Sequence, residues 1–178
     1  MFFSIEELEL KKLWFDVTFP AGEIEYDDKR LRQATPLLAA GSAELLGNTL
    51  GEIRVKGHLS VTLETDCDRC LEPARFPIES DFDLFYRPAE TSVPGSEEVE
   101  IDEGEAEIAF YEGNGLELKD ILREQILLLM PMQRVCREDC HGICPVCGQN
   151  RNVVSCGCQI KTADDRWSEL KKLSLKGT

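Results

Sequence analysis

The spacing of eight cysteines constrains this chain more than any other feature of its sequence. Six crowd one segment and two form a separate Cys-x-x-Cys pair: Cys67, Cys70, Cys136, Cys140, Cys144, Cys147, Cys156 and Cys158. A Cys-x-x-Cys turn places two sulfurs on one side of the chain, at a separation that suits tetrahedral zinc. Because a chain of 178 residues can bury a core without crosslinks, the cysteines need an explanation other than stapling a very small domain.

The eight cysteines divide naturally into two sites of four. One predicted site is a ribbon-like loop with the ligands Cys144, Cys147, Cys156 and Cys158. The other joins a turn between two strands to a distant segment, with the ligands Cys67, Cys70, Cys136 and Cys140. Because Cys156-Gly-Cys158 is shorter than the usual two-residue spacing, a single structural zinc that draws on both Cys-x-x-Cys pairs stays open as an alternative. Four thiolates also serve iron–sulfur clusters, so the sulfur ligands alone do not select zinc.

The N-terminal sequence favours a reducing compartment. Glu6 and Glu7 interrupt the apolar run that a signal peptide needs. The longest apolar stretch, residues 126–130, is too short for a membrane span of about 20 residues. We therefore expect a cytoplasmic protein with no membrane partner, in which clustered thiols favour metal over disulfides.

Hydrophobic alternation predicts an α+β fold with a mainly antiparallel sheet. Two long segments, 53–66 and 74–86, alternate apolar and polar residues with a period of two. The Cys67/Cys70 pair would lie at the tip of the hairpin that joins them. This position argues against a redox pair, which would be expected to open a helix.

Shorter patterns add further elements. Strands are predicted at 14–19 and 107–111, whereas the apolar segment 36–46 could be strand or helix. Apolar residues that recur every three or four positions predict one packed helix over 116–130, ended by Pro131. A last helical pattern covers residues 164–173.

These patterns predict two parts of the chain. Residues 1–131 would form the α+β core, including the hairpin tip with Cys67 and Cys70. Residues 132–178 would form a cysteine-rich, zinc-stabilised segment and a C-terminal helix, packed on the core. A structural zinc contributes on the order of 10 kcal/mol to folding, enough to fix this segment to the sheet.

The charge of the chain restricts how it could meet nucleic acid. With a formal net charge of -14, the molecule as a whole is repelled by phosphate. RNA contact would need a local basic face, for which the candidates are Arg134, Arg137, Arg151, Arg166, Lys171 and Lys172. The acidic run within 97–107 is either a solvated loop or an arm that binds a basic protein.

The sequence favours a non-enzymatic role. It contains no phosphate-binding Gly-rich loop, no nucleophile elbow and no persuasive pair of acid and base carboxylates, and no small-molecule substrate is evident. Catalytic zinc keeps an open position and normally uses histidine or carboxylate ligands. His141, beside the cysteines, is read as a surface histidine, with a substitute ligand role as the alternative.

Four motifs together resemble the bacterial and plastid YceD family. They are Cys67-Asp-Arg-Cys70-Leu-Glu-Pro after a long strand, the helix pattern Leu118 to Pro131, the run Cys136-Arg-Glu-Asp-Cys140-His-Gly-Ile-Cys144-Pro-Val-Cys147-Gly, and the closing Asp165-Arg166-Trp167 to Leu173. The family is associated with accumulation of large-subunit ribosomal RNA. The resemblance therefore implies a ribosome-biogenesis factor whose partner is a ribosomal RNA precursor, a ribosomal protein or a processing protein. Members vary in the second cysteine cluster, which implies a structural and dispensable metal there.

Overall fold

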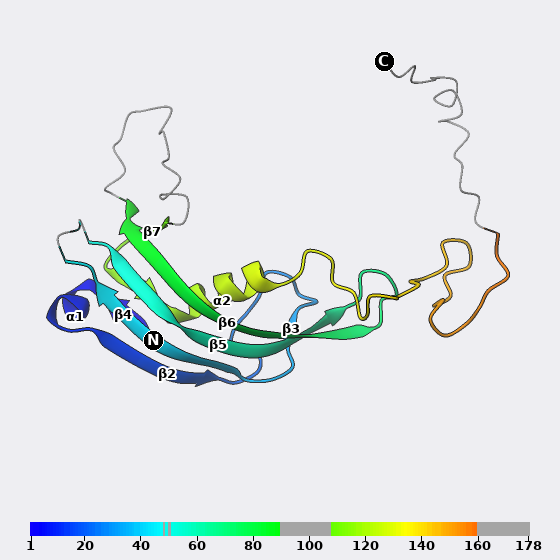
Figure 1. The fold of residues 1–178 in the computed structure, drawn as a ribbon, viewed down its shortest axis with the longest axis horizontal. Coiled ribbons are helices and arrows are strands. Elements are labelled where there is room, and N and C mark those ends of the chain that lie inside the picture. The colour runs from blue at the N-terminus through cyan, green and yellow to red at the C-terminus, as the bar shows by residue number, and fades with distance from the viewer. Residues whose placement is uncertain (48, 50, 90–107, 160–178) are drawn as a thin grey trace, which may run out of the picture.

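A six-stranded sheet forms the body of the protein in the computed structural model, which describes residues 1–47, 49, 51–89 and 108–159 (Figure 1). The path across the sheet is β2 (Leu13–Phe19), β4 (Leu37–Leu45), β5 (Ile53–Asp66), β6 (Pro73–Pro88) and β7 (Ile108–Tyr111). The short strand β3 (Arg32–Gln33) pairs with β5 beyond the end of β4. All pairs are antiparallel except β6 and β7, which are parallel.

The β5–β6 hairpin confirms the strongest sequence pattern. Its register runs from Ile53 opposite Tyr86 to Asp66 opposite Pro73. Alternate side chains of β5 are buried: Ile53, Val55, Leu59, Val61, Leu63 and Thr65. The pairing of β4 ends at Ser60, so the last part of the hairpin extends past the widest part of the sheet. This extension carries the 67–72 turn away from the main core.

Helix α2 (Leu118–Leu129) packs across one face of the sheet. It buries Leu118, Ile121, Leu122 and Ile126 in the main core, as the apolar periodicity predicts. The helix begins later than expected, because residues 115–117 form strand β8 (Gly115–Glu117) instead. Leu129 continues the apolar spacing of this helix but is 41% exposed, whereas Met130 at the helix end is buried.

The N-terminal residues form elements that the sequence patterns do not predict. Strand β1 (Phe2–Ser4) pairs with β8, and helix α1 (Ile5–Leu10) follows at once. The Ser4 hydroxyl accepts a hydrogen bond from the Glu7 N–H at 3.3 Å and caps this helix. Both elements are too short to show a recognisable apolar periodicity, so the sequence patterns do not predict them.

Several other predictions can be compared with these elements. The predicted strands at 14–19 and 107–111 are confirmed as β2 and β7, and the undecided segment 36–46 forms β4. The acidic run and the C-terminal helix pattern lie outside the described residues. Within the described part of the chain, no helix is long and apolar enough to cross a membrane.

Candidate metal centres

Both Cys-x-x-Cys turns have the same backbone construction. In the hairpin tip, the Leu71 N–H donates to the Cys67 carbonyl at 2.9 Å, and Leu71 adopts the left-handed region with φ 64°. In the second turn, the Gly148 N–H donates to the Cys144 carbonyl at 2.8 Å, with φ 73°. Glycine adopts this conformation freely, whereas leucine does so at a cost of about 1–2 kcal/mol. The hairpin tip therefore keeps a strained residue next to its second cysteine.

The inner cluster joins the hairpin tip to the segment that follows α2. Its members are Cys67, Cys70, Cys136 and Cys140, whose sulfurs all lie within 4.8 Å of one another. Two hydrogen bonds align the segments: the Asp68 N–H donates to the Arg134 carbonyl at 2.8 Å, and the Arg134 N–H donates to the Asp68 side-chain carboxylate at 2.7 Å. Figure 1 shows the tip lying beside this segment.

The sulfur spacing of the inner cluster fits a tetrahedral metal ion. The Cys67 and Cys140 sulfurs are 3.9 Å apart, and the Cys70 and Cys136 sulfurs are 3.7 Å apart. Four sulfurs at about 2.3 Å from one zinc ion are separated by about 3.8 Å along each tetrahedral edge. A disulfide would need about 2.05 Å, and all eight cysteines, which lie within the described residues, are free.

The outer cluster contains the remaining cysteines, Cys144, Cys147, Cys156 and Cys158, again with all sulfurs within 4.8 Å of one another. Cys144 is buried, Cys147 is exposed, and the other two are half-buried. The Cys144 N–H donates to the Gln149 carbonyl at 2.8 Å, which closes the turn. The structure thus groups the cysteines into the two sets of four that the sequence spacing favours.

The pKa values of the inner-cluster thiols are shifted in opposite directions. Burial opposes ionisation of Cys67, but backbone N–H groups of the hairpin tip and of Cys136 outweigh it and lower the Cys67 thiol pKa to about 6. Burial and the neighbouring sulfurs raise the pKa of Cys136 to about 12. One thiolate forms readily and opposes the next one, a conflict that a bound dication would remove.

The outer cluster repeats this pattern. The backbone N–H groups of Cys147 and Val146 lower the pKa of the Cys144 thiol to about 6. The neighbouring Cys147 sulfur, together with burial, raises the pKa of Cys158 to about 12. Each cluster therefore combines at least one thiol of lowered pKa with at least one of raised pKa.

Three of the six predicted RNA-contacting residues, Arg134, Arg137 and Arg151, lie within the described residues. Arg134 pairs with Asp28 at 2.8 Å, and Arg137 pairs with Asp139 at 3.2 Å. Arg151 is exposed in the loop of the outer cluster. The remaining candidates, Arg166, Lys171 and Lys172, lie outside the described residues. His141 is exposed and belongs to neither cluster.

The Asp28–Arg134 pair fastens the cysteine segment to the loop before β3, and it makes stability depend on pH. Hydrogen bonds from Arg30 first, and from Arg134, hold the pKa of Asp28 well below its usual range. The stabilisation is therefore present above the unfolded-state pKa of about 4 and is lost as the pH falls below it.

Asp28→Asn is expected to lower the free energy of unfolding by about 0.5–1 kcal/mol at pH 7, because the ion pairs that it removes are partly exposed. Urea unfolding at several pH values measures this difference, which should shrink below about pH 4 as the Asp28 carboxylate of the unfolded chain protonates. The exposed carboxylate of β2 provides the control, Asp16→Asn. Equal losses for the two variants would show that the pair does not anchor the segment.

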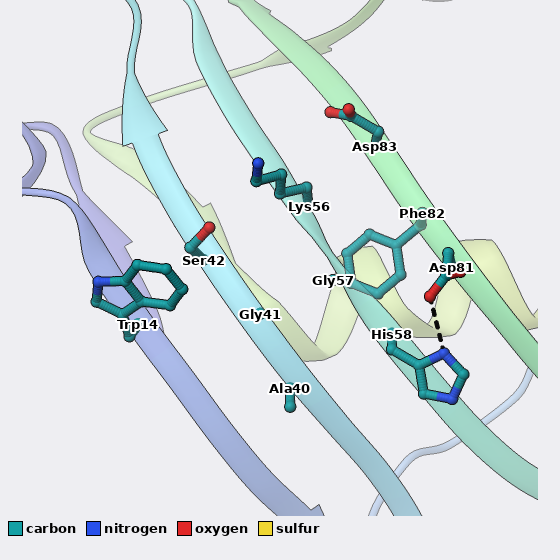
Figure 2. Close-up of a pocket in the computed structure, with 10 residues that line it drawn as sticks. All are labelled: Trp14, Ala40, Gly41, Ser42, Lys56, Gly57, His58, Asp81, Phe82 and Asp83. Carbon is teal, nitrogen blue, oxygen red and sulfur yellow. Dashed lines mark hydrogen bonds and ion pairs between the residues drawn. The ribbon is translucent and has the colours of Figure 1, made fainter.

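The sheet face seen in Figure 2 carries a shallow depression, lined by Trp14, Ala40, Gly41, Ser42, Lys56, Gly57, His58, Asp81, Phe82 and Asp83. The His58 Nδ1 atom lies 2.9 Å from the Asp81 carboxylate, and Nε2 lies 3.6 Å from the Glu79 carboxylate. Within the described residues, these two carboxylates are the hydrogen-bond and ion-pair partners found for His58.

Sequence reasoning missed the polar residues that hold the clusters in place. Asn152 donates to the Cys140 sulfur at 3.3 Å, and Arg69 donates to the Cys140 carbonyl at 3.3 Å. Asp28 contacts Arg134 across more than a hundred residues. No periodicity or spacing marks such contacts, because each one depends on segments that meet only in the folded chain.

The fold and the two clusters define an α+β protein with two candidate metal centres, each made of four cysteines. Residues 55–174 match the family model described as "Large ribosomal RNA subunit accumulation protein YceD". The chain therefore belongs to the YceD family, which is linked to accumulation of the large ribosomal RNA subunit.

Curated relatives support this membership at low identity. The chloroplastic "Large ribosomal RNA subunit accumulation protein YCED homolog 1" of Zea mays is 25% identical over 178 residues, covering 78% of this chain and 59% of the relative. An uncharacterized protein of Mycobacterium tuberculosis is 27% identical over 122 residues, covering 68% of this chain and 55% of the relative. The chain thus spans between half and two thirds of the length of these relatives. No solved structure matches it significantly.

Proposed function

We propose that this protein is a non-catalytic, zinc-stabilised ribosome-biogenesis factor that supports accumulation or processing of large-subunit ribosomal RNA. The observation that carries the proposal is the family match over residues 55–174, a range that contains all eight cysteines of the two clusters. The name of the maize relative refers to accumulation of the large ribosomal RNA subunit as well.

Zinc is the metal that we propose for both clusters. Four-cysteine sites without an open ligand position are typical of structural zinc. The free thiols agree with a reducing compartment, which we take to be the cytoplasm. Because each cluster already supplies four sulfurs, two zinc ions per chain are a better account than one ion shared between both Cys-x-x-Cys pairs.

The zinc would act structurally, by holding chain segments together. In the inner cluster, ligands from the β5–β6 hairpin and from the segment after α2 would bind one ion. Bound zinc would neutralise part of the thiolate charge and make this junction rigid. The protein would then present a fixed surface around the hairpin tip to a ribosomal RNA precursor or to a protein of the assembly pathway.

Cells that lack the gene are expected to show a lower ratio of large-subunit to small-subunit ribosomal RNA, which gel quantification of total RNA measures. Wild-type protein should restore the ratio, and so should the surface variant Val153→Ala. Cys67→Ser, which breaks the inner cluster, should not restore it. An unchanged ratio in the gene-deleted cells would contradict the proposed function.

A second candidate function is that of an adaptor that binds a basic ribosomal or processing protein and makes no direct RNA contact. Two observations favour it: the net charge of -14 and the intramolecular ion pairs of Arg134 and Arg137. Direct RNA binding should weaken as salt rises, and should weaken further when Lys171 and Lys172 are both replaced by glutamate. Absence of RNA binding by the purified chain at low salt, with a loss of function when residues 96–107 are deleted, would select the adaptor.

A further inference from the structure

The three residues that link the two clusters are held from both sides. The Ile143 N–H donates to the Arg69 carbonyl of the hairpin tip at 2.8 Å. Gly142 lies so close to the same residue that a Cβ atom there would be 2.8 Å from the Arg69 carbonyl oxygen. On the other side, the Gly142 carbonyl accepts from the Arg151 N–H at 2.9 Å. The linker is thus clamped between the hairpin tip and the loop of the outer cluster.

Asn152 connects the two clusters most directly. It lies in the loop between Cys147 and Cys156 of the outer cluster, yet its Nδ2 donates to the sulfur of Cys140 in the inner cluster at 3.3 Å. Its Oδ1 accepts from the His141 N–H at 2.8 Å, so one amide side chain holds both a ligand and the residue after it. Groups that hydrogen-bond to metal ligands orient those ligands and tune the affinity of the site.

The loop around Asn152 is itself fastened to the hairpin tip. The Asn152 N–H donates to the Asn150 side-chain oxygen at 2.9 Å. The Asn150 side-chain nitrogen in turn donates to the Glu72 carboxylate at 3.4 Å. A change in the loop of the outer cluster therefore reaches the inner cluster by two routes, one to the Cys140 sulfur and one to the hairpin tip.

The clusters differ in how far solvent reaches their sulfurs. In the inner cluster, Cys67 is fully buried, Cys70 and Cys140 are at most 5% exposed, and only Cys136 is exposed. In the outer cluster, only Cys144 is buried, and the other cysteines are exposed or half-buried. Ligand exchange with a chelator or another thiol needs access to the sulfurs, so the outer cluster should exchange its metal faster.

We propose that the two clusters form a coupled pair of metal sites, in which the exchangeable outer site controls metal retention by the buried inner site and Asn152 is the positioning residue that links them. The proposal rests on the metal binding put forward above. With metal bound, the outer loop is fixed and Asn152 remains on Cys140; without it, the loop loosens and this hydrogen bond is lost. By thermodynamic reciprocity, metal in the inner site also favours metal in the outer site.

Asn152→Asp separates this coupling from general folding. The aspartate keeps an acceptor for the His141 N–H but lacks the donor to the Cys140 sulfur. We expect it to speed metal release from the inner site by about 10–100-fold, the usual effect of losing such a contact. Cadmium-113 NMR of the full chain, saturated with cadmium, should show one resonance per site and a shift of the inner resonance in this variant. The exposed neighbour Val153, as Val153→Ala, should leave both resonances unchanged.

A double-mutant cycle tests the coupling itself. Cys158→Ser removes the outer metal and should speed release of cadmium from the inner site to a chelator by at least about tenfold. In the Asn152→Asp background the same change should add less than it does in the wild-type chain, because the direct route to the Cys140 sulfur is already broken. Independent effects on the release rate, or an unmoved inner resonance in Asn152→Asp, would overturn the coupling and leave the proposed function intact. A wild-type chain that binds no cadmium would overturn both.

Discussion

Cys67→Ser is expected to lower the free energy of unfolding by about 5 kcal/mol or more, about half of what a structural zinc contributes to a small domain. Cys67 is fully buried at the end of the hairpin, where its sulfur accepts a hydrogen bond from the Cys136 N–H at 3.3 Å. Loss of this ligand would release the inner metal and separate the hairpin tip from the segment after α2. Urea unfolding, with metal analysis of the same samples, measures both effects.

Cys158→Ser is the matched control, because it removes one ligand of the same kind from the outer cluster. Cys158 is half-buried and is not part of the main core. We therefore expect the free energy of unfolding to fall by no more than about 2 kcal/mol. One metal ion per chain should be lost. If the two variants lose the same free energy of unfolding, the two clusters stabilise the fold equally. That result would contradict the expectation that the inner cluster stabilises it more.

Gly41→Ala is expected to destabilise the protein by about 3 kcal/mol, the upper part of the range for overpacked sites. Gly41 of β4 lies directly opposite Gly57 of β5. A Cβ atom on Gly41 would be 2.2 Å from the Lys56 carbonyl oxygen and 2.7 Å from the ring of Phe15. Because the first of these atoms belongs to the backbone, the two strands would have to move apart.

Gly47→Ala tests whether this cost comes from the close approach of the strands. A Cβ atom on Gly47 would meet no atom within 4 Å, so its free energy of unfolding should stay within about 0.5 kcal/mol of the wild-type value. Thermal unfolding of both variants with saturating metal gives the comparison. A change of less than about 1 kcal/mol in Gly41→Ala would mean that β4 and β5 are not as close as the structure has them.

The long hairpin and the grouping of the cysteines could be predicted because their signals are local. Alternation in β5 and β6 repeats over many residues, and each Cys-x-x-Cys turn is complete within four residues. The assignment of Cys136 and Cys140 to the hairpin tip followed from counting ligands in fours. The packed helix was also predictable, since its buried residues recur at helical spacing.

Pairings between distant short segments could not be predicted. Strand β1 has three residues and finds β8 more than a hundred residues later, and β7 joins the sheet in parallel to β6. Neither of these strand pairings is indicated by a periodic pattern of apolar residues in the sequence. The apolar segment that became β4 shows the same limit, because a short apolar run fits strand and helix equally well until its neighbours are known.

In the candidate metal centres, the cysteine ligands could be recognised from the sequence, but the residues that hydrogen-bond to them could not. Cysteine is recognisable by its chemistry, whereas an asparagine such as Asn152 acquires a role only from what it touches. The predicted basic face stays a prediction, and what the sequence could not show is that one of its members, Arg134, pairs with Asp28.

The zinc content of the full chain, purified without added metal or reductant, tests the presence of two metal centres most directly. The two clusters predict two zinc ions per chain and no disulfide, by elemental analysis together with a thiol titration. One zinc per chain would favour a single site shared by both Cys-x-x-Cys pairs. A protein without metal, with its cysteines joined in disulfides, would contradict both the metal centres and the reducing compartment.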